Sequence, residues 1–167
     1  MGERLTQEDV KKIQEEIEYR KLTVRKNAIE AVKEARAHGD LSENFEYHAA
    51  KKDKNSNESR IRYLERMLKN ATIVKDTAGE DEAGLNKLVE IYFEEDDETE
   101  TYKLVTSIRG NSISGKISIE SPMGKAVLGK KAGERVYVKV NENAGYYVRI
   151  KSVKKAEDME EDEIRRF

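Results

Sequence analysis

Cysteine and tryptophan are absent from this chain of 167 residues, and proline occurs only once. Without cysteine, a disulfide-bonded scaffold and a thiolate metal site are excluded. The opening stretch MGERLTQEDVKK has no apolar run, so we expect no secretory signal, and no later run is long enough to span a bilayer. We therefore expect a cytoplasmic protein, in which the sequons at Asn57 and Asn70 have no function.

Hydrophobic residues are also scarce, at 37%, whereas charged residues make up 40% of the chain. A composition of this kind is typical of a long helical element exposed to solvent rather than of a thick core. Residues 1–75 carry 17 Lys and Arg against 14 Asp and Glu, and residues 76–167 carry 15 against 20. The weakly basic first half would suit contact with phosphate, although a solvated surface explains it equally well.

The pattern of residues 6–37 predicts one helix. Thr6 is a plausible N-cap, followed by Glu8 and Asp9 in the first turn, where the helix dipole favours negative charge. Apolar or small residues then recur at spacings of three and four if Arg20 is allowed into the seam: Val10, Ile13, Ile17, Val24, Ala28, Ala31 and Ala35. This narrow stripe is typical of a coiled coil.

A second helical stripe follows Gly39. It restarts with Leu41, Phe45 and Ala49 and resumes with Ile61, Leu64, Leu68 and Ala71. Folding the chain back at Gly39 matches the ends of the two stripes, so we predict an antiparallel coiled-coil hairpin. The middle of the second helix, KKDKNSNESR at 51–60, is almost free of apolar residues, and we expect a loosely packed, polar mid-section there.

From residue 86 the hydrophobic period changes to two. Five segments alternate or are rich in β-branched and aromatic residues: 87–93, 100–108, 115–121, 134–140 and 145–153. The stretch SPMGKAVLGKK at 121–131 predicts a short helix, with Ser121 as N-cap, Pro122 at the first position and Gly129 as its end. We thus predict an α+β fold with four parts: a hairpin at 1–75, a linker at 76–85, an antiparallel sheet domain with one short helix at 86–155 and a charged tail at 156–167.

Two short patterns suggest ligand sites that the sequence does not support. GNSISGKI at 110–117 has the glycine and lysine spacing of a phosphate-binding loop, but Ile117 lies in a strand pattern where a helix should begin. His38 and His48 flank a pair of acids without the close spacing of a zinc site. We interpret the first as a turn and the two histidines as polar helix residues.

The pair of acids between the two helices, Asp40 and Glu43, has two interpretations. The pattern D-x-x-E at a helix start is a capping box, in which each side chain accepts from backbone N–H groups. Local pattern alone favours this interpretation. It does not explain why a long, thinly packed hairpin would extend only to end in a cap.

The stretch HGDLSENFEYHAA resembles the tip signature of the bacterial Gre transcript-cleavage factors, and the resemblance continues through SPMGKAVLGKKAGERV. It runs from LTQEDVKKIQEEIEYRK to about Val153 and is closer to the GreA type than to the GreB type. The resemblance implies that the coiled coil enters the secondary channel of RNA polymerase. It also implies that the sheet domain is FKBP-like and docks outside that channel.

The resemblance also assigns roles to individual residues. Asp40 and Glu43 would act as the catalytic pair, reaching the polymerase active centre in a complex whose RNA 3′ end has backtracked. There they would supply oxygen ligands to a second, weakly held Mg²⁺ and orient the attacking water. Arg36, Tyr47 and Lys51 match positions near the RNA 3′ segment, and Ser121, Pro122 and Met123 match a polymerase-docking loop. The family more often has Arg at Lys51 and Ala at Phe45.

On this interpretation the chain is not an enzyme, because it has no complete active site and shares Mg²⁺ with polymerase. Three alternatives remain. An inhibitory paralogue would occupy the channel without promoting cleavage, which the presence of both acids argues against. A prolyl isomerase or chaperone module would need an aromatic-rich pocket, and the chain has only three Phe and no Trp. A structural coiled-coil adaptor would tolerate neutral residues at Asp40 and Glu43.

Overall fold

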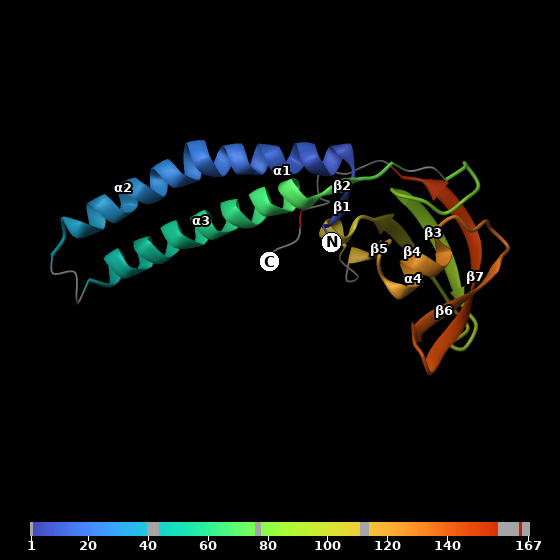
Figure 1. The fold of residues 1–167 in the computed structure, drawn as a ribbon. Coiled ribbons are helices and arrows are strands. Elements are labelled where there is room, and N and C mark those ends of the chain that lie inside the picture. The colour runs from blue at the N-terminus through green and yellow to red at the C-terminus, as the bar shows by residue number, and fades with distance from the viewer. Residues whose placement is uncertain (1, 40–43, 76–77, 111–113, 157–163, 165–167) are drawn as a thin grey trace. The chain divides into compact units, whose positions relative to one another are not determined.

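A computed structural model describes residues 2–39, 44–75, 78–110, 114–156 and 164. The chain divides into two compact units, residues 1–73 and 74–166 (Figure 1). The first unit is helical and the second is built around a sheet, so the predicted α+β fold class is confirmed. None of the helices among the described residues is long and apolar enough to cross a membrane.

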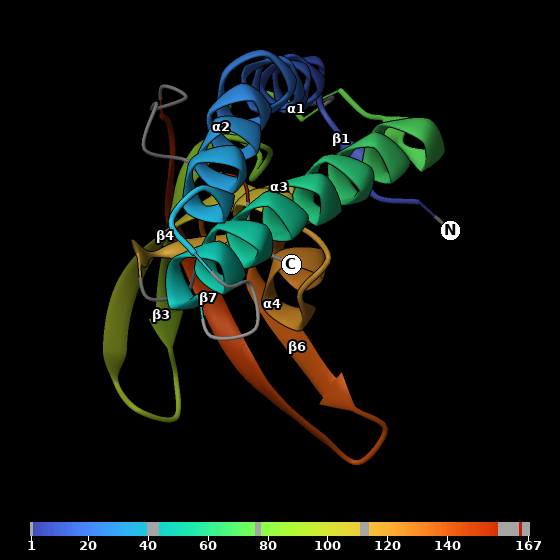
Figure 2. The same ribbon diagram turned by 90° about the vertical axis from the view of Figure 1, so that its left-hand side faces the viewer.

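The first unit is the predicted antiparallel hairpin (Figure 2). Its first arm begins at the predicted cap: the Thr6 hydroxyl accepts from the Asp9 N–H at 3.1 Å, and the Thr6 N–H donates to the Asp9 carboxylate at 2.9 Å. This reciprocal pair satisfies two backbone donors at the helix start. The helical elements are α1 (Gln7–Tyr19), η1 (Arg20–Val24), α2 (Arg25–Arg36) and α3 (Phe45–Asn70).

The first arm differs from the prediction of one regular helix. The segment η1 is a π-helix, in which the Arg25 N–H donates to the carbonyl of Arg20, five residues back. Such a turn inserts one extra residue and rotates the side chains that follow it around the helix axis. The apolar stripes on α1 and α2 are therefore offset at the point where Arg20 replaces an apolar residue in the seam.

The apolar seam of the hairpin is concentrated at its open end, where Leu5, Ile13 and Leu64 are completely buried. There β1 (Arg4–Leu5) pairs in parallel with β2 (Thr72–Ile73), which the sequence analysis did not foresee. The predicted place of Phe45 in the stripe is wrong, because its side chain is 87% exposed. Tyr47, at 9% exposed, is the buried aromatic residue instead.

The second unit is a five-stranded sheet in the order β5-β4-β3-β7-β6. All neighbouring strands are antiparallel except β4 and β5, which pair in parallel, so the predicted sheet is mostly rather than wholly antiparallel. The connection between these two strands includes the 3₁₀ turn η2 (Ser107–Arg109). The strands are β3 (Lys87–Phe93), β4 (Glu98–Val105), β5 (Lys116–Ser118), β6 (Arg135–Asn141) and β7 (Ala144–Lys155).

The short helix α4 (Pro122–Val127) packs on the core side of the sheet, with Val127 fully buried against the strands. The residues at its two ends are as predicted: Ser121 is the N-cap, Pro122 occupies the first position and Gly129, after its last turn, has a φ of 81°. A residue with a side chain would be strained at that φ, so glycine ends the helix at low cost. Part of the segment expected as a linker also packs into this unit, where Ala83 and Leu85 are buried.

Candidate functional site at the hairpin tip

The tip of the hairpin joins the end of α2 at Arg36 to the start of α3 at Phe45. The two acids singled out by the sequence, Asp40 and Glu43, lie outside the described residues. The described residues that flank them on both helices define where the chain enters and leaves this segment.

Asn44 ties the two helix ends together. Its side-chain oxygen accepts from the Tyr47 N–H at 3.0 Å, which makes Asn44 the N-cap of α3. Its amide nitrogen donates to the carbonyl of Ala35, near the end of α2, at 2.6 Å. The capping-box interpretation placed the start of this helix at Asp40, and this is corrected: the cap is Asn44, four residues further on. Asn44 was not predicted as a cap, although asparagine is among the preferred capping residues.

Next to this bridge, the tip places together all three residues that the resemblance assigned to RNA contact. The guanidinium of Arg36, on α2, lies 5.6 Å from the centre of the Tyr47 ring, on α3. A hydrogen bond from Arg36, together with the charge of Lys51, lowers the pKa of Tyr47 from its ordinary value. The Arg36 and Lys51 side chains are exposed. Two accessible cations thus converge on one buried ring within a turn of the acidic segment.

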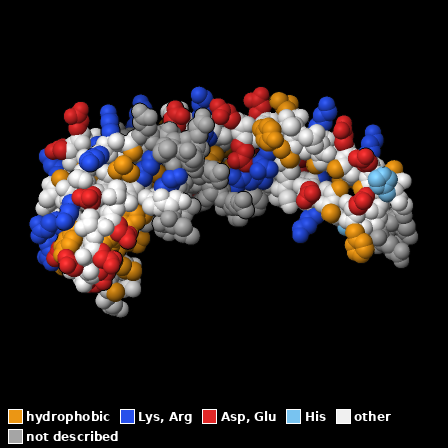
Figure 3. Space-filling view, turned by 180° about the vertical axis from the view of Figure 1, so that it is seen from behind, with side chains coloured by type: hydrophobic (Ala, Val, Ile, Leu, Met, Phe, Trp, Pro, Cys, Tyr) orange, Lys and Arg blue, Asp and Glu red, His pale blue; other side chains and the backbone are white. Residues whose placement is uncertain are grey.

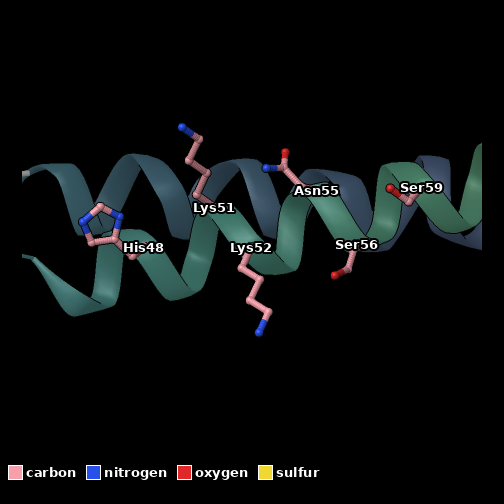
Figure 4. Close-up of a pocket in the computed structure, with 6 residues that line it drawn as sticks. All are labelled: His48, Lys51, Lys52, Asn55, Ser56 and Ser59. Atoms are coloured by element: carbon pink, nitrogen blue, oxygen red, sulfur yellow. The ribbon is translucent and has the colours of Figure 1, made fainter.

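A shallow groove on α3 continues from Lys51 along the helix. It has a volume of about 510 Å³ and is lined by polar and basic residues: His48, Lys51, Lys52, Asn55, Ser56 and Ser59. Figure 4 shows Lys51 and Lys52 extending from α3 to opposite sides. A second groove of about 560 Å³, between α2 and α3, is lined mainly by small and acidic residues, including Glu34, Glu46 and Asp53. Only the first groove has the charge to receive a phosphate chain.

Within the described part of the chain, no group of three or more acids and histidines could hold a metal ion. His38 instead contacts Glu46, with Nδ1 and a carboxylate oxygen 3.0 Å apart. Asp40 and Glu43 are carboxylates, the ligand type that Mg²⁺ prefers.

The middle of the hairpin is polar, as predicted, but it is not loosely packed. Asn57 and Arg60 are only 4% and 8% exposed. The Asn57 amide oxygen accepts from the Arg20 guanidinium at 3.0 Å, and its amide nitrogen donates to the Arg20 carbonyl at 3.3 Å. Glu16 accepts from Arg60 at 2.9 Å and from Arg20 at 2.7 Å. We call these four residues, Glu16, Arg20, Asn57 and Arg60, the polar clamp.

Beside the polar clamp, Arg25 and Glu58 form a two-pronged pair, with both nitrogen–oxygen distances at 2.8 Å. Burial raises the pKa of Glu16, but hydrogen bonds from Arg60 and Arg20 outweigh it, so the net pKa lies below the ordinary value of 4.5. A hydrogen bond from Arg25 likewise lowers the pKa of Glu58. Charges of both signs also alternate over the visible surface of the helical unit (Figure 3).

In the second unit, the three residues matched to a docking loop open α4. The Ser121 hydroxyl accepts from the Gly124 N–H at 3.0 Å and donates to the Ser118 carbonyl at 2.6 Å, so its proton is already used within the fold. Met123 is half-buried against the core, whereas Pro122 is exposed. Of these three side chains, Pro122 is the most available to another protein.

Comparison with known proteins gives the same family for both units. The family described as "Transcription elongation factor, N-terminal" matches residues 3–73. The family described as "Transcription elongation factor, GreA/GreB, C-term" matches residues 78–155.

Individual relatives carry a consistent description. The transcription elongation factor GreA of Bacillus subtilis (strain 168) is 42% identical over 134 residues, which cover 80% of this chain and 85% of the relative. That of Staphylococcus saprophyticus is 40% identical over 150 residues, covering 90% and 95%. Among solved structures, GreA factor homolog 1 of Thermus thermophilus is 26% identical, covers 92% of this chain and 99% of its own, and has a TM-score of 0.43.

Proposed function

Because the chain belongs to the GreA/GreB family of transcription elongation factors, we propose that it binds RNA polymerase and stimulates cleavage of backtracked RNA. The helical hairpin would enter the secondary channel, and the sheet unit would dock outside it. The observation that best supports this proposal is the convergence of Arg36, Tyr47 and Lys51 beside the segment that carries Asp40 and Glu43. That arrangement combines cations for an RNA backbone with acids for a catalytic metal.

The chemistry follows from the two acids. A second Mg²⁺, shared with the polymerase, would activate water and stabilise the charge that develops on the cleaved phosphate. Asp40 and Glu43 would supply charged oxygen ligands and orient the attacking water. One carboxylate could bind metal or position water, and the pair can do both at once. Because the remaining metal ligands must come from polymerase, this chain would have no complete active site of its own.

Arg36 and Lys51 would hold the displaced RNA 3′ segment by its phosphates. The Arg36 guanidinium can contact a phosphate with two N–H groups, whereas Lys51 acts as a point charge. Tyr47 would keep Arg36 in place, since the guanidinium lies over its ring. Tyr47 would thus act mainly by positioning the cation.

We predict that the double variant Arg36→Ala/Lys51→Ala needs about tenfold more protein to reach half-maximal RNA cleavage, because electrostatic attraction to RNA is lost. Cleavage at saturating protein should be close to normal, and the melting temperature should change little because both side chains are exposed. The measurement is a concentration series on a stalled, backtracked elongation complex. The matched control, Lys26→Ala/Lys69→Ala, removes two exposed cations elsewhere on the hairpin. If the two variants showed the same dependence of RNA cleavage on protein concentration, Arg36 and Lys51 would have no specific role in RNA binding.

The docking role of α4 can be tested at Pro122. Replacement by glutamate keeps the helix start, because acidic residues are favourable in the first turn, but it places a charge on the exposed surface. Pro122→Glu should weaken competition with the wild-type protein for polymerase and leave the melting temperature unchanged. Thr101→Glu, at an exposed site on β4, provides the control for an added charge. Unaltered competition by Pro122→Glu would place the docking surface elsewhere.

A further inference from the structure

The outer face of β6 and β7 exposes an unusual set of side chains. Along both strands the inward positions Val136, Val138, Val148 and Ile150 are buried in the core. The positions between them face solvent, as the alternation of a strand requires. They carry tyrosines and cations rather than the usual small polar residues: Arg135, Tyr137, Lys139, Tyr147, Arg149 and Lys151. We call these six residues the tyrosine–cation face.

Two tyrosines at its centre form an aromatic platform. Tyr137 and Tyr147 are direct cross-strand partners with ring centres 5.0 Å apart, and they are 48% and 43% exposed. The hydroxyl end of the Tyr137 ring lies over Gly145, where an added Cβ would come within 2.3 Å of that hydroxyl. Only a glycine at position 145 therefore leaves room for this end of the ring. The hydroxyl end packs against the backbone, while about half of Tyr137 stays exposed to solvent.

The second tyrosine is held in position by a cation and an acid. The Arg135 guanidinium lies 3.7 Å from the centre of the Tyr147 ring. Its Nε donates at 2.8 Å to the carboxylate of Glu94, the residue that follows β3. This stack limits the motion of Tyr147 and lowers the entropy that a ligand would have to remove on binding. The Tyr147 ring is thus held in position in the unbound protein.

Positive charge gathers around the platform. Arg135 and Arg149 are direct cross-strand partners, an arrangement of like charges that destabilises a sheet. Within the described part of the chain, Lys139, Arg149 and Lys151 form no ion pair within 4.0 Å. Arg149 lies close enough to Glu94 to help lower the pKa of that carboxyl, and Lys151 lies 5.0 Å from the centre of the Tyr92 ring. This contrasts with residues 76–167 as a whole, which carry 15 basic and 20 acidic residues. This face is therefore rich in basic residues, although the second half of the chain has more acidic than basic residues.

We infer that the tyrosine–cation face binds a short single strand of nucleic acid, with bases stacked on Tyr137 and Tyr147 and phosphates on Arg149 and the two lysines. Exposed aromatic rings beside cations on a sheet are the features by which proteins bind single strands without reading their sequence. An acidic peptide would match the charge, but it would not need two exposed aromatic rings side by side. This site is separate from the hairpin tip and does not depend on the proposed cleavage activity.

The test uses the full-length protein and fluorescence anisotropy of labelled oligo-uridine RNA and oligo-thymidine DNA. Both strands should bind, because stacking and phosphate contacts do not require the 2′-hydroxyl. Affinity should fall as salt rises, since phosphate contacts release counterions. Tyr137→Thr/Tyr147→Thr should weaken binding about tenfold or more, given the usual contribution of a stacked base. Tyr137→Phe/Tyr147→Phe should bind like the wild type, because only the ring is needed.

Three controls make the result decisive. Tyr19→Ala removes a tyrosine that is 59% exposed on the hairpin and should have no effect. Arg149→Ala/Lys151→Ala should weaken binding and reduce its salt dependence. A duplex of matched sequence should bind at least about tenfold more weakly, because its bases are not free to stack. The inference would be overturned by equal binding of duplex and single strand, by undiminished binding of the folded threonine variant, or by binding of an acidic peptide alone.

Discussion

Replacing both tip acids, as Asp40→Asn/Glu43→Gln, is expected to reduce stimulated RNA cleavage to nearly the level of polymerase alone. Both replacements keep the size of the side chain and its ability to accept hydrogen bonds. They remove the negative charge, and an amide oxygen is a far weaker ligand for Mg²⁺ than a carboxylate. Raising the Mg²⁺ concentration should restore part of the activity. The measurement is the cleavage rate at equal occupancy of polymerase by the two proteins.

The capping interpretation predicts a different outcome for the same variant, because asparagine and glutamine can still cap a helix. Since Asn44 is the N-cap of α3, we expect the double variant to change the free energy of unfolding by less than about 1 kcal/mol. Asn44→Ala is the matched control: it should lower stability by about 1 kcal/mol while leaving both acids in place. Wild-type cleavage by the double variant would contradict the proposed role of the acids.

The second large effect is expected from the polar clamp in the middle of the hairpin. Towards the tip, the side chains that α2 and α3 turn to each other are small. Ala31 of α2 lines the same groove as Ala49 and Ala50 of α3. Small side chains hold the relative register of two helices only weakly. The polar clamp, by contrast, can form its paired hydrogen bonds in a single register, as buried polar residues do in other coiled coils. We therefore expect it, with the Arg25–Glu58 pair beside it, to determine how far the tip acids reach.

This can be tested by replacing all four clamp residues with leucine at once, which leaves no member of the cluster without its partner. Such exchanges of buried ionic groups are commonly neutral or raise stability by about 1–4 kcal/mol. Stimulated cleavage should nevertheless fall by about 100-fold, since misplacement of a catalytic group by about 1 Å can have that effect. If the four-leucine variant lost both stability and cleavage activity, the polar clamp would serve only to stabilise the hairpin.

The register itself can be measured without polymerase. Because the chain has no cysteine, spin labels can be attached to cysteines introduced at Lys33 and Lys52, on α2 and α3. The wild-type background should give one narrow distance, and the four-leucine variant should add a population shifted by about one helical turn, or about 5.4 Å. Lys21→Ala/Glu65→Ala, which removes an exposed ion pair with a 3.3 Å contact, should retain the single distance.

The polar clamp also predicts an acid response. The pKa of Glu16 is lower in the folded hairpin than its ordinary value of 4.5, so its contribution to stability is complete above that pH. The contribution is lost as pH falls below 4.5 and the carboxylate takes up a proton that the unfolded chain binds more readily. The four-leucine variant should therefore lose less stability than the wild type over this acid range.

Much of the fold could be predicted because local signals agree with the final structure. Thr6, Ser121 and Gly129 mark helix ends by their own side chains or by their lack of one, and alternation marks the strands. The π-helical turn at Arg20–Val24 could not be predicted, because its extra residue is stabilised by Asn57 on the other arm, 37 positions away. The pairing of β1 with β2 and the parallel pairing of β5 are likewise decided by distant segments.

The candidate site was predicted only in part. Spacing alone suggested a helical bend with two acids, and the resemblance added Arg36, Tyr47 and Lys51, which the structure places together. Neither pattern nor resemblance indicated Asn44, because its two hydrogen bonds join helix ends that periodicity treats separately. Phe45 was misassigned because an apolar residue at helical spacing was taken to face the partner helix. Close to the tip that rule fails, since the partner helix ends at Arg36.

We propose that this protein makes polymerase cleave RNA whose 3′ end has backtracked. The most direct measurement adds the wild-type protein to a stalled, backtracked elongation complex carrying RNA labelled at its 3′ end. We expect rapid release of short labelled 3′ fragments, followed by renewed elongation when nucleotides are supplied. Occupancy of polymerase by the protein without release of such fragments, or with slower elongation, would contradict it and favour an inhibitory factor.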